Sequence, residues 1–264
     1  MKDRIFLETA AHVATVVLNR PEKRNALDPA MFEALVEAGE RLKAQRNIRA
    51  VVLRGAGPAF SAGVDLSALP EMARLVHEAG GLMRRSHGPA NLFQQASLIW
   101  REIPVPVIAA VHGHVLGGAF QIMLGADIRV AAPGCRFSIM EGRWGLVPDM
   151  GGMVLMRRVA RSDVIRRLVY TAEEFSAEQA LEWGFVTEIG EDPQARAQEL
   201  AGIIATRSPD AVRAAKALIN ESDFADPETI LLAESRHQES LIGTPNQTEA
   251  VMAGLQNATP RFRD

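Results

Sequence analysis

The feature that most constrains this chain is an alternation of short apolar strands with amphipathic helices, which stops about two-thirds of the way along. Runs rich in β-branched residues at 5–9, 12–19, 50–54 and 107–111 predict strands. After Ile189 only helical patterns follow. Because strands that alternate with helices favour a layered sheet, the sequence predicts an α/β core with a helical C-terminal section.

Several helix starts can be predicted from capping residues in the sequence. Asp28-Pro29, Ser208-Pro209 and Thr244-Pro245 each combine a capping side chain with a first-turn proline, and Ser176 with Gln179 forms a capping box. The apolar stripes on the helices from Ser208 onward are hard to bury on a small appendage. We therefore expect a core with the active site at 1–190, a helical section at 191–264, and association between subunits; folding of these helices onto their own core is the alternative.

Composition excludes several classes of function. The chain has 264 residues and a net charge of −3, so no overall field attracts nucleic acid or an anionic membrane. Cys135 is the only cysteine, and the six histidines show no metal-ligand spacing, so no metal site is expected. No apolar run is long enough to span a bilayer, and the first residues do not form a signal peptide. We expect a cytoplasmic protein without nucleic-acid or membrane partners; the arginine-rich run at 157–167 is expected to be a solvated helix face.

Two glycine-containing turns are the first candidates for chemistry. Residues 60–66 (FSAGVDL) follow one predicted strand, and residues 114–121 (HVLGGAFQ) follow another. In both, a strand delivers small residues to a helix start, where unpaired backbone N–H groups point outward. Two such turns brought together provide a pair of donors for a developing oxyanion. The alternative is that the glycines only permit tight turns.

Segments along nearly the whole chain resemble one known superfamily. Residues 19–27 (NRPEKRNAL), 60–66, 106–113 (PVIAAVHG) with Gly117-Gly118, and 127–129 (DIR) resemble the enoyl-CoA hydratase/isomerase (crotonase) superfamily. The match continues in order through 137–152 and 176–184 and covers nearly the whole chain. It implies a crotonase-like spiral of ββα units with two roughly perpendicular sheets. It also implies a helical C-terminal part that packs subunits as a homotrimer or homohexamer.

The resemblance also implies how the turns are used. It assigns the backbone N–H groups of Val64 and Gly118 to an oxyanion hole for a thioester oxygen. The substrate is then an acyl-CoA, and no separate cofactor is expected because coenzyme A arrives as part of that substrate. Residues expected to contact the substrate are Arg24, Ala26, Ala62, Asp65 and Leu66, with Arg20 and Lys23 as nearby charges for its phosphates.

Three polar side chains decide the expected reaction. Hydratases of this superfamily carry two glutamates; the position of the first is Gln121 here, and the second is retained as Glu141. An amide cannot transfer a proton at neutral pH, although it can orient a group by hydrogen bonding. Asp149 matches the catalytic aspartate of some dienoyl-CoA isomerases, and the alternative is a helix cap.

With Glu141 as the one retained glutamate, whose alternative reading is a surface carboxylate before a turn, double-bond isomerisation of an enoyl-CoA is the preferred reaction. One carboxylate that removes a proton at one carbon and returns it at another is sufficient for that chemistry. A hydratase and a non-catalytic acyl-CoA-binding relative remain the alternatives. From the sequence, Gln121→Glu is expected to restore the second carboxylate and raise hydration of a 2-enoyl-CoA.

Overall fold

The main sheet has six strands in the order β1-β2-β3-β4-β6-β9 in the computed structural model, which describes residues 3–78 and 80–264. β1 pairs antiparallel with β2, and all the other neighbours are parallel. Parallel strands place their carboxyl ends at one edge, so the connections that leave β3 and β4 meet there. The strand bounds are β1 Ile5–Ala10, β2 Val13–Leu18, β3 Ala50–Gly55, β4 Val107–Val111, β6 Ile128–Ala131 and β9 Glu188–Ile189.

A second, three-stranded sheet lies below this edge. It consists of β5 His114–Leu116, β7 Arg136–Ser138 and β8 Glu174–Ser176, with β5 parallel to β7 and β7 antiparallel to β8. The second glycine turn, expected at 114–121, therefore begins with a short strand. β5 follows β4 closely in the chain and leads directly into Gly117-Gly118, the glycine pair of the second turn.

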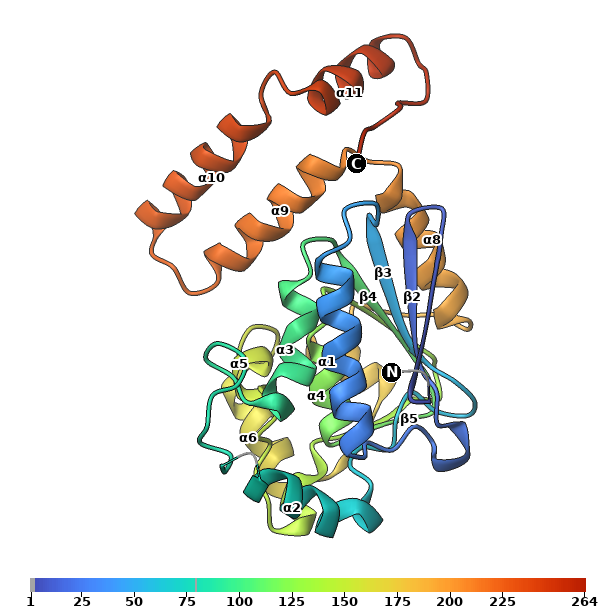
Figure 1. Ribbon diagram of the computed structural model, residues 1–264, viewed down its shortest axis with the longest axis vertical. Helices are drawn as coiled ribbons and strands as arrows, with labels where there is room; N and C mark the ends of the chain where they lie inside the picture. The colour runs from blue at the N-terminus through green and yellow to red at the C-terminus, as the bar shows by residue number, and fades with distance from the viewer. Residues whose placement is uncertain (1–2, 79) are drawn as a thin grey trace.

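Helices cover both faces of the main sheet (Figure 1). On one face, α1 and α3 pack together and enclose the larger core, which includes Phe32, Trp100 and Phe120. On the other face, α8 packs with its alanines Ala197 and Ala201 against β3 and β4. The helices of the body are α1 Pro29–Lys43, α2 Leu69–Glu78, α3 Leu92–Glu102, α4 Gly118–Leu124, α5 Gly152–Met156, α6 Ser162–Thr171, α7 Ala177–Glu182 and α8 Pro193–Ala205.

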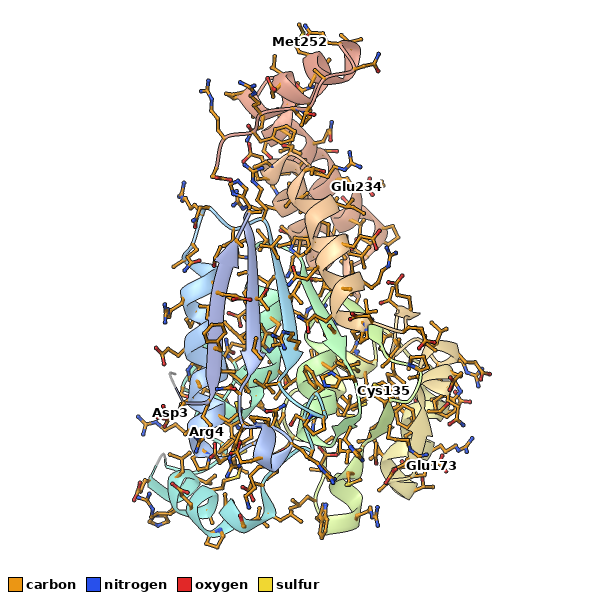
Figure 2. All side chains as sticks on the ribbon, turned by 90° about the vertical axis from the view of Figure 1, so that its right-hand side faces the viewer. Asp3, Arg4, Cys135, Glu173, Glu234 and Met252 are labelled. Carbon is orange, nitrogen blue, oxygen red and sulfur yellow. The ribbon has the colours of Figure 1, made fainter. Side chains whose placement is uncertain are left out.

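The last three helices extend beyond this body (Figures 1 and 2). They are α9 Pro209–Ser222, α10 Pro227–Leu241 and α11 Pro245–Leu255. α9 packs against α10, and Met252 of α11 lies at the far tip of the molecule. The expected change from mixed α/β to all-helical structure is confirmed just after β9. The first helix after this change, α8, nevertheless packs on the main sheet.

The helix starts predicted from sequence are confirmed in detail. The Asp28 carboxylate accepts the Met31 N–H at 2.9 Å, and Ser176 and Gln179 form the reciprocal capping box. None of the helices in the described ranges combines the length and the apolar composition that crossing a bilayer requires.

Candidate active site

The two glycine turns lie side by side. Ser61 pairs with Val115 as an isolated parallel bridge, with the Ser61 N–H donating to the His114 carbonyl at 3.0 Å. Gly63 has φ +85°, and a Cβ placed on it would stand 2.5 Å from the Leu116 carbonyl oxygen and 3.8 Å from the Gly118 nitrogen. Only glycine accepts both this conformation and this approach. The fold therefore brings the two turns together, as the oxyanion-hole hypothesis requires.

The N–H groups of Val64 and Gly118 are both available for a ligand. Leu27 pairs with the backbone on either side of Val64, accepting the Asp65 N–H and donating to the Gly63 carbonyl, but the Val64 N–H itself has no acceptor within residues 3–78 and 80–264. The Gly118 N–H, at the first position of α4, likewise finds none in that part of the chain. Two adjoining unpaired donors at a helix start are suited to bind an oxygen that gains negative charge.

Glu141 faces these donors. It lies on the 3-10 helix η3 (Met140–Trp144) and is only partly exposed. A Cβ on Gly117 would stand 3.6 Å from Glu141 Oε1, so the carboxylate lies over the second glycine turn. Its Oε2 is buried and has no hydrogen-bond partner among the described residues. Burial raises the Glu141 pKa above its usual value, and the nearby charge of Asp149 raises the pKa further.

Gln121 holds the other oxygen of that carboxylate. The Gln121 side chain is fully buried, and its Nε2 donates to Glu141 Oε1 at 2.6 Å. Its own Oε1 accepts two backbone N–H groups, from Met150 and Gly152, each at 2.9 Å. Both lone pairs of the amide oxygen are thus used, and one of its two N–H groups orients Glu141. Gln121 fixes which Glu141 oxygen remains free.

Asp149 is close to the site but is not a helix cap. The N-cap of α5 is Gly151, which makes no side-chain cap, so the capping alternative is wrong. Although part of the Asp149 surface remains exposed, desolvation of its carboxyl raises its pKa above the usual value. Its charge in turn raises the Glu141 pKa. The charge of Asp149 therefore acts on Glu141, although Asp149 itself is exposed.

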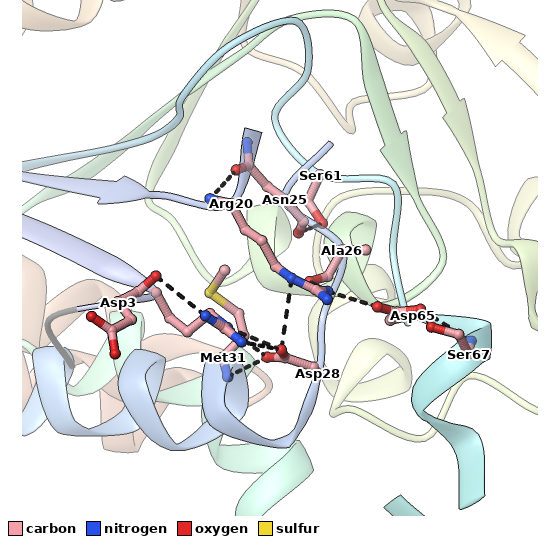
Figure 3. Close-up of polar contacts among 10 residues, drawn as sticks. Asp3, Arg20, Asn25, Ala26, Asp28, Met31, Ser61, Asp65 and Ser67 are labelled. Carbon is pink, nitrogen blue, oxygen red and sulfur yellow. Dashed lines mark hydrogen bonds and ion pairs between the residues drawn. The ribbon is translucent and has the colours of Figure 1, made fainter. Parts of the chain in front are cut away.

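A polar network behind the first turn accounts for other residues expected at the site (Figure 3). The Arg20 guanidinium donates to the Asp65 carboxylate at 2.7 Å, and the Ser67 hydroxyl donates to the same carboxylate at 2.6 Å. Asp28 lies 3.7 Å from the Arg20 guanidinium and 2.7 Å from that of Arg4, so it links this network to Arg4. Asp65 was expected to contact the substrate and Arg20 to lie near its phosphates. In the structure the two side chains bind each other next to Val64.

Asn25 is a structural residue of the same region that its sequence motif did not reveal. It is fully buried in the left-handed conformation (φ +54°), which asparagine tolerates. Its amide donates to the carbonyls of Ala56, Ala59 and Phe60, and its own carbonyl accepts the Ser61 hydroxyl at 2.7 Å. These bonds fix the segment that leads into the first glycine turn.

A cavity of about 350 Å³ opens over the two turns and Glu141. Val64 and Gly118 line it together with Ala62 and Leu66, so the structure gathers these four expected residues around Glu141. Further lining residues, which were not expected to contact the substrate, are Leu69, Leu116, Met140, Trp144 and Leu146. Arg24 and Ala26 do not line the cavity, but the Arg24 carbonyl accepts the Ala62 N–H at 2.9 Å and so borders it.

The arginine-rich run at 157–167 is paired within the chain. Arg157 stacks 3.9 Å from the centre of the Phe224 ring, and Arg158 lies 2.7 Å from Asp223. Arg161 and Arg167 pair with acidic side chains, and Arg166 donates to Tyr170. Across residues 3–78 and 80–264, no three His, Cys, Asp or Glu side chains are grouped so that they could hold a metal ion.

The raised pKa of Glu141 predicts a pH-dependent effect on stability. Above its usual pKa of 4.5 the unfolded carboxyl ionises first, so the folded protein loses stability as pH rises towards the higher folded pKa. Glu141→Gln should therefore raise Tm at pH 8 and leave it unchanged near pH 4, because the amide has no charge to desolvate at either pH. Calorimetry at several pH values, with exposed Glu8→Gln as control, measures this. A lower Tm at pH 8 would contradict it.

Comparisons with known proteins agree with this geometry. The enoyl-CoA hydratase/isomerase family model matches residues 8–264. The chain is 30% identical to the short-chain-enoyl-CoA hydratase of Clostridium acetobutylicum over 96% of this chain and 95% of that protein. It is 31% identical to the mitochondrial Delta(3,5)-Delta(2,4)-dienoyl-CoA isomerase of Mus musculus, covering 93% and 77% of the two chains.

A solved structure shares the fold over the same extent. The crystal structure of enoyl-CoA hydratase from Bacillus anthracis matches with a TM-score of 0.89 and 30% identity, covering 98% of both chains. This agreement confirms the expected α/β crotonase-like fold. The chain belongs to the enoyl-CoA hydratase/isomerase family.

Proposed function

We propose that the protein isomerises the double bond of an enoyl-CoA, with Glu141 as the single proton shuttle and the N–H groups of Val64 and Gly118 as the oxyanion hole. The observation that carries the proposal is the free, buried Oε2 of Glu141 beside two unpaired backbone donors. A desolvated carboxylate of raised pKa is suited to accept and return a proton near neutral pH.

The reaction follows from these three groups. In a 3-enoyl-CoA, Glu141 removes a proton from C2, and the electron pair of that C–H bond passes into a dienolate whose charge rests on the thioester oxygen. The Val64 and Gly118 N–H groups stabilise that charge. Return of the proton to C4 moves the double bond from C3–C4 to C2–C3. Glu141 ends as it began, so no net proton is consumed.

Hydration of a 2-enoyl-CoA is the alternative favoured by the name of the Clostridium relative. In this site, however, the Gln121 amide oxygen is saturated by backbone donors and cannot accept a proton from water. A second alternative, isomerisation of a dienoyl-CoA with Asp149 as partner of Glu141, is supported by their electrostatic coupling and by the mouse relative. A non-catalytic acyl-CoA-binding protein is the remaining alternative.

A spectrophotometric assay for thioester-conjugated double bonds distinguishes the isomerase from the alternative functions. The proposal predicts turnover of a 3-enoyl-CoA well above that of matched 2-enoyl- and dienoyl-CoA substrates. Efficient hydration of the 2-enoyl-CoA would defeat it, and tight acyl-CoA binding without any turnover would favour the binding protein. Asp149→Asn tests the dienoyl reading, since a loss confined to dienoyl-CoA would assign Asp149 a proton-transfer role.

The geometry around Gln121 changes the result expected for Gln121→Glu. A glutamate would keep one oxygen on the Met150 and Gly152 N–H groups and place the other about 2.6 Å from Glu141 Oε1. Two carboxylates that close share one proton. Because the two backbone N–H groups favour the charged form of residue 121, the proton rests on Glu141, which then no longer acts as a free base near neutral pH. We expect isomerase activity at pH 7 to fall at least about 10-fold and to recover at higher pH, without a gain in hydration.

The pH–rate profile of Gln121→Glu is the deciding measurement. The double variant Gln121→Glu, Glu141→Gln is the control, because it restores one amide and one acid and should remove the shift of the profile. An unshifted profile in the single variant, or a hydration rate above wild type, would show that residue 121 faces the substrate.

The projecting helices support a homotrimer or homohexamer as part of the same proposal. Large apolar side chains on and beside them are exposed, including Ile219, Leu231, Leu232, Ile242 and Leu255. An exposed apolar surface of this kind is typical of an interface between subunits. Sedimentation should therefore show an oligomer at micromolar concentration, which Leu231→Glu with Leu232→Glu dissociates and exposed Glu234→Gln leaves intact. A monomeric wild type would contradict the expectation.

The remaining assignments stay predictions. The substrate would bring coenzyme A to the edge near Arg24 and Ala26, without a separate cofactor and without nucleic-acid or membrane partners. A cytoplasmic location also stays a prediction.

A further inference from the structure

A second cavity lies at the opposite end of α4 from the candidate active site. It has a volume of about 460 Å³, against about 350 Å³ for the cavity at Glu141, and the two share no lining residue. Leu124, the last residue of α4, lines the second cavity, whereas Gly118, the first, lines the other. Figure 1 shows α9 between α10 and the body, so this cavity lies where the projecting helices join the body.

The wall of the second cavity carries an excess of positive charge. Four cations and two carboxylates line it, which leaves an excess of two positive charges: Arg101, Arg129, Arg158, Lys216, Asp127 and Asp223. Most of the remaining wall is aliphatic and comes from both α9 and the body, including Leu124, Ile128, Leu155, Val159 and Val212. The cavity thus combines a cationic part with an apolar part.

Asp127 pairs with only one of the two buried cations near it. Its Oδ2 accepts the Lys216 Nζ at 2.7 Å. Arg129 is also buried, and it donates to backbone carbonyls, including those of Phe185 and Ala126, each at 2.7 Å. Burial lowers the Arg129 pKa to about 10, although the charge of Asp127 acts in the opposite direction. The Arg129 guanidinium is therefore a buried charge that is bonded to neutral groups.

Arg101 and Arg158 have one carboxylate between them. Asp223 Oδ2 lies 2.6 Å from Arg101 Nη2 and 2.7 Å from Arg158 Nη1. The Arg158 Nε is buried and finds no acceptor in the part of the chain that the structure describes. Burial lowers the Arg158 pKa, and the charge of Arg101 lowers it further. Because buried charges are normally paired, this cavity lacks negative charge.

These charges define the ligand that fits. A single head group with two negative charges offsets the excess, and an apolar tail covers the aliphatic part of the wall. A phosphate monoester combines both features, since it carries a charge close to −2 above pH 7 and offers three acceptor oxygens to guanidinium donors. A monocarboxylate supplies only one charge, and a dicarboxylate has no apolar end.

We propose that the cavity between α9 and the body is a binding site for a phosphate monoester with an apolar tail, held by Arg101, Arg129 and Arg158. Such a ligand joins α9 to the body and leaves the acyl-CoA site free, since the two cavities have no lining residue in common. The inference goes beyond the proposed isomerase reaction and does not depend on it.

Isothermal titration calorimetry of the wild-type protein with hexyl phosphate, inorganic phosphate and 1-hexanol separates the head group from the tail. We expect hexyl phosphate to bind at least about 10-fold more tightly than inorganic phosphate, because burial of its methylene groups adds to the ionic contacts. 1-Hexanol, which lacks the charge, should not bind measurably. Saturating butanoyl-CoA, which occupies the acyl-CoA site, should leave the affinity for hexyl phosphate unchanged.

Three results would overturn the proposal. They are the absence of hexyl phosphate binding, its displacement by butanoyl-CoA, and binding of 1-hexanol as tight as that of hexyl phosphate. Equal affinity for hexyl phosphate and inorganic phosphate would overturn the assignment of the apolar wall to a tail.

Arg158→Gln tests the contact with the head group. We expect it to weaken hexyl phosphate binding at least about 10-fold, as loss of one partner from a buried charge contact does, and to leave butanoyl-CoA affinity unchanged. Arg161→Gln is the matched control, because it removes the same charge from a side chain that is 78% exposed and paired with Asp163. Arg158→Lys keeps the charge and should bind hexyl phosphate more tightly than Arg158→Gln. Circular dichroism verifies that each variant is folded. Equal hexyl phosphate affinity in folded Arg158→Gln and Arg161→Gln would overturn the site.

Discussion

Replacing Glu141 by glutamine is expected to lower kcat for the 3-enoyl-CoA about 10²–10⁴-fold while leaving acyl-CoA affinity nearly unchanged. The substitution keeps the size of the side chain, and its amide oxygen can still accept the 2.6 Å bond from Gln121 Nε2. What it removes is the free Oε2 that takes and returns the proton. Stopped-flow or steady-state rates, combined with calorimetric affinities, separate the two effects.

The pH profile of the wild type gives an independent check on the same residue. A base must be ionised to act, and burial together with Asp149 raises the Glu141 pKa. We therefore expect kcat/KM to increase with pH through a pKa above 4.5, and to lose this ascending limb in Glu141→Gln. Glu8→Gln, on the exposed side of β1, is the control and should match wild type. A Glu141→Gln protein with residual activity near the wild-type level would assign the proton transfer to another group.

The loss of activity and the gain in stability predicted for Glu141→Gln have one cause. The cavity wall that makes Glu141 a suitable base also desolvates its charge, so the carboxylate weakens the fold above its usual pKa. If both effects are measured in the same variant, they identify burial as the source of the shifted pKa. A structural carboxylate would give the opposite sign in the stability measurement.

Much of the fold was predictable because it depends on local signals. β-Branched runs gave the strands, and cap-proline pairs gave the starts of α1, α9 and α11. The same signal occurs at Asp192-Pro193 and Asp226-Pro227, where α8 and α10 begin. Local signals do not show against which part of the molecule a helix packs. The alanine-rich face of α8 is only weakly amphipathic in sequence, yet it packs on one face of the main sheet.

The parts of the site that could be predicted are those in which a sequence motif supplies backbone groups. The two glycine turns were identified as donors because their neighbours are strand and helix start, and the structure brings them together. Side-chain partners joining distant segments were not predictable. Arg20 and Asp65 were expected near the substrate, and their pairing with each other across 45 positions was not foreseen. Gln121 was expected to orient a group by hydrogen bonding, but the bonds of its oxygen to the Met150 and Gly152 N–H groups were not foreseen.

The oxyanion hole itself is tested by Gly118→Pro, which removes one donor. Gly118 opens α4, the helix position that best tolerates proline, so the backbone can keep its course. We expect kcat/KM to fall about 10²–10³-fold below that of Gly118→Ala, since loss of one oxyanion-hole donor has an effect of this size. Steady-state kinetics of both variants, with circular dichroism to verify folding, gives the comparison.

Gly118→Ala is the matched control for the Cβ that both variants add. A Cβ at this position would stand 2.7 Å from Met150 Sδ and 3.1 Å from Leu27 Cδ1, so alanine and proline displace the same neighbours. Proline also replaces the N–H by its ring Cδ, so the difference between the two variants reports the loss of the donor position as a whole. The thioester carbonyl stretch of a bound saturated acyl-CoA offers a second reading by infrared difference spectroscopy. It should shift to lower frequency in wild type and Gly118→Ala, and shift less in Gly118→Pro. A folded Gly118→Pro protein with the rate and the carbonyl shift of Gly118→Ala would show that the thioester oxygen binds elsewhere. The Val64 N–H would then lose its place in the mechanism too, because the two donors act on one oxygen.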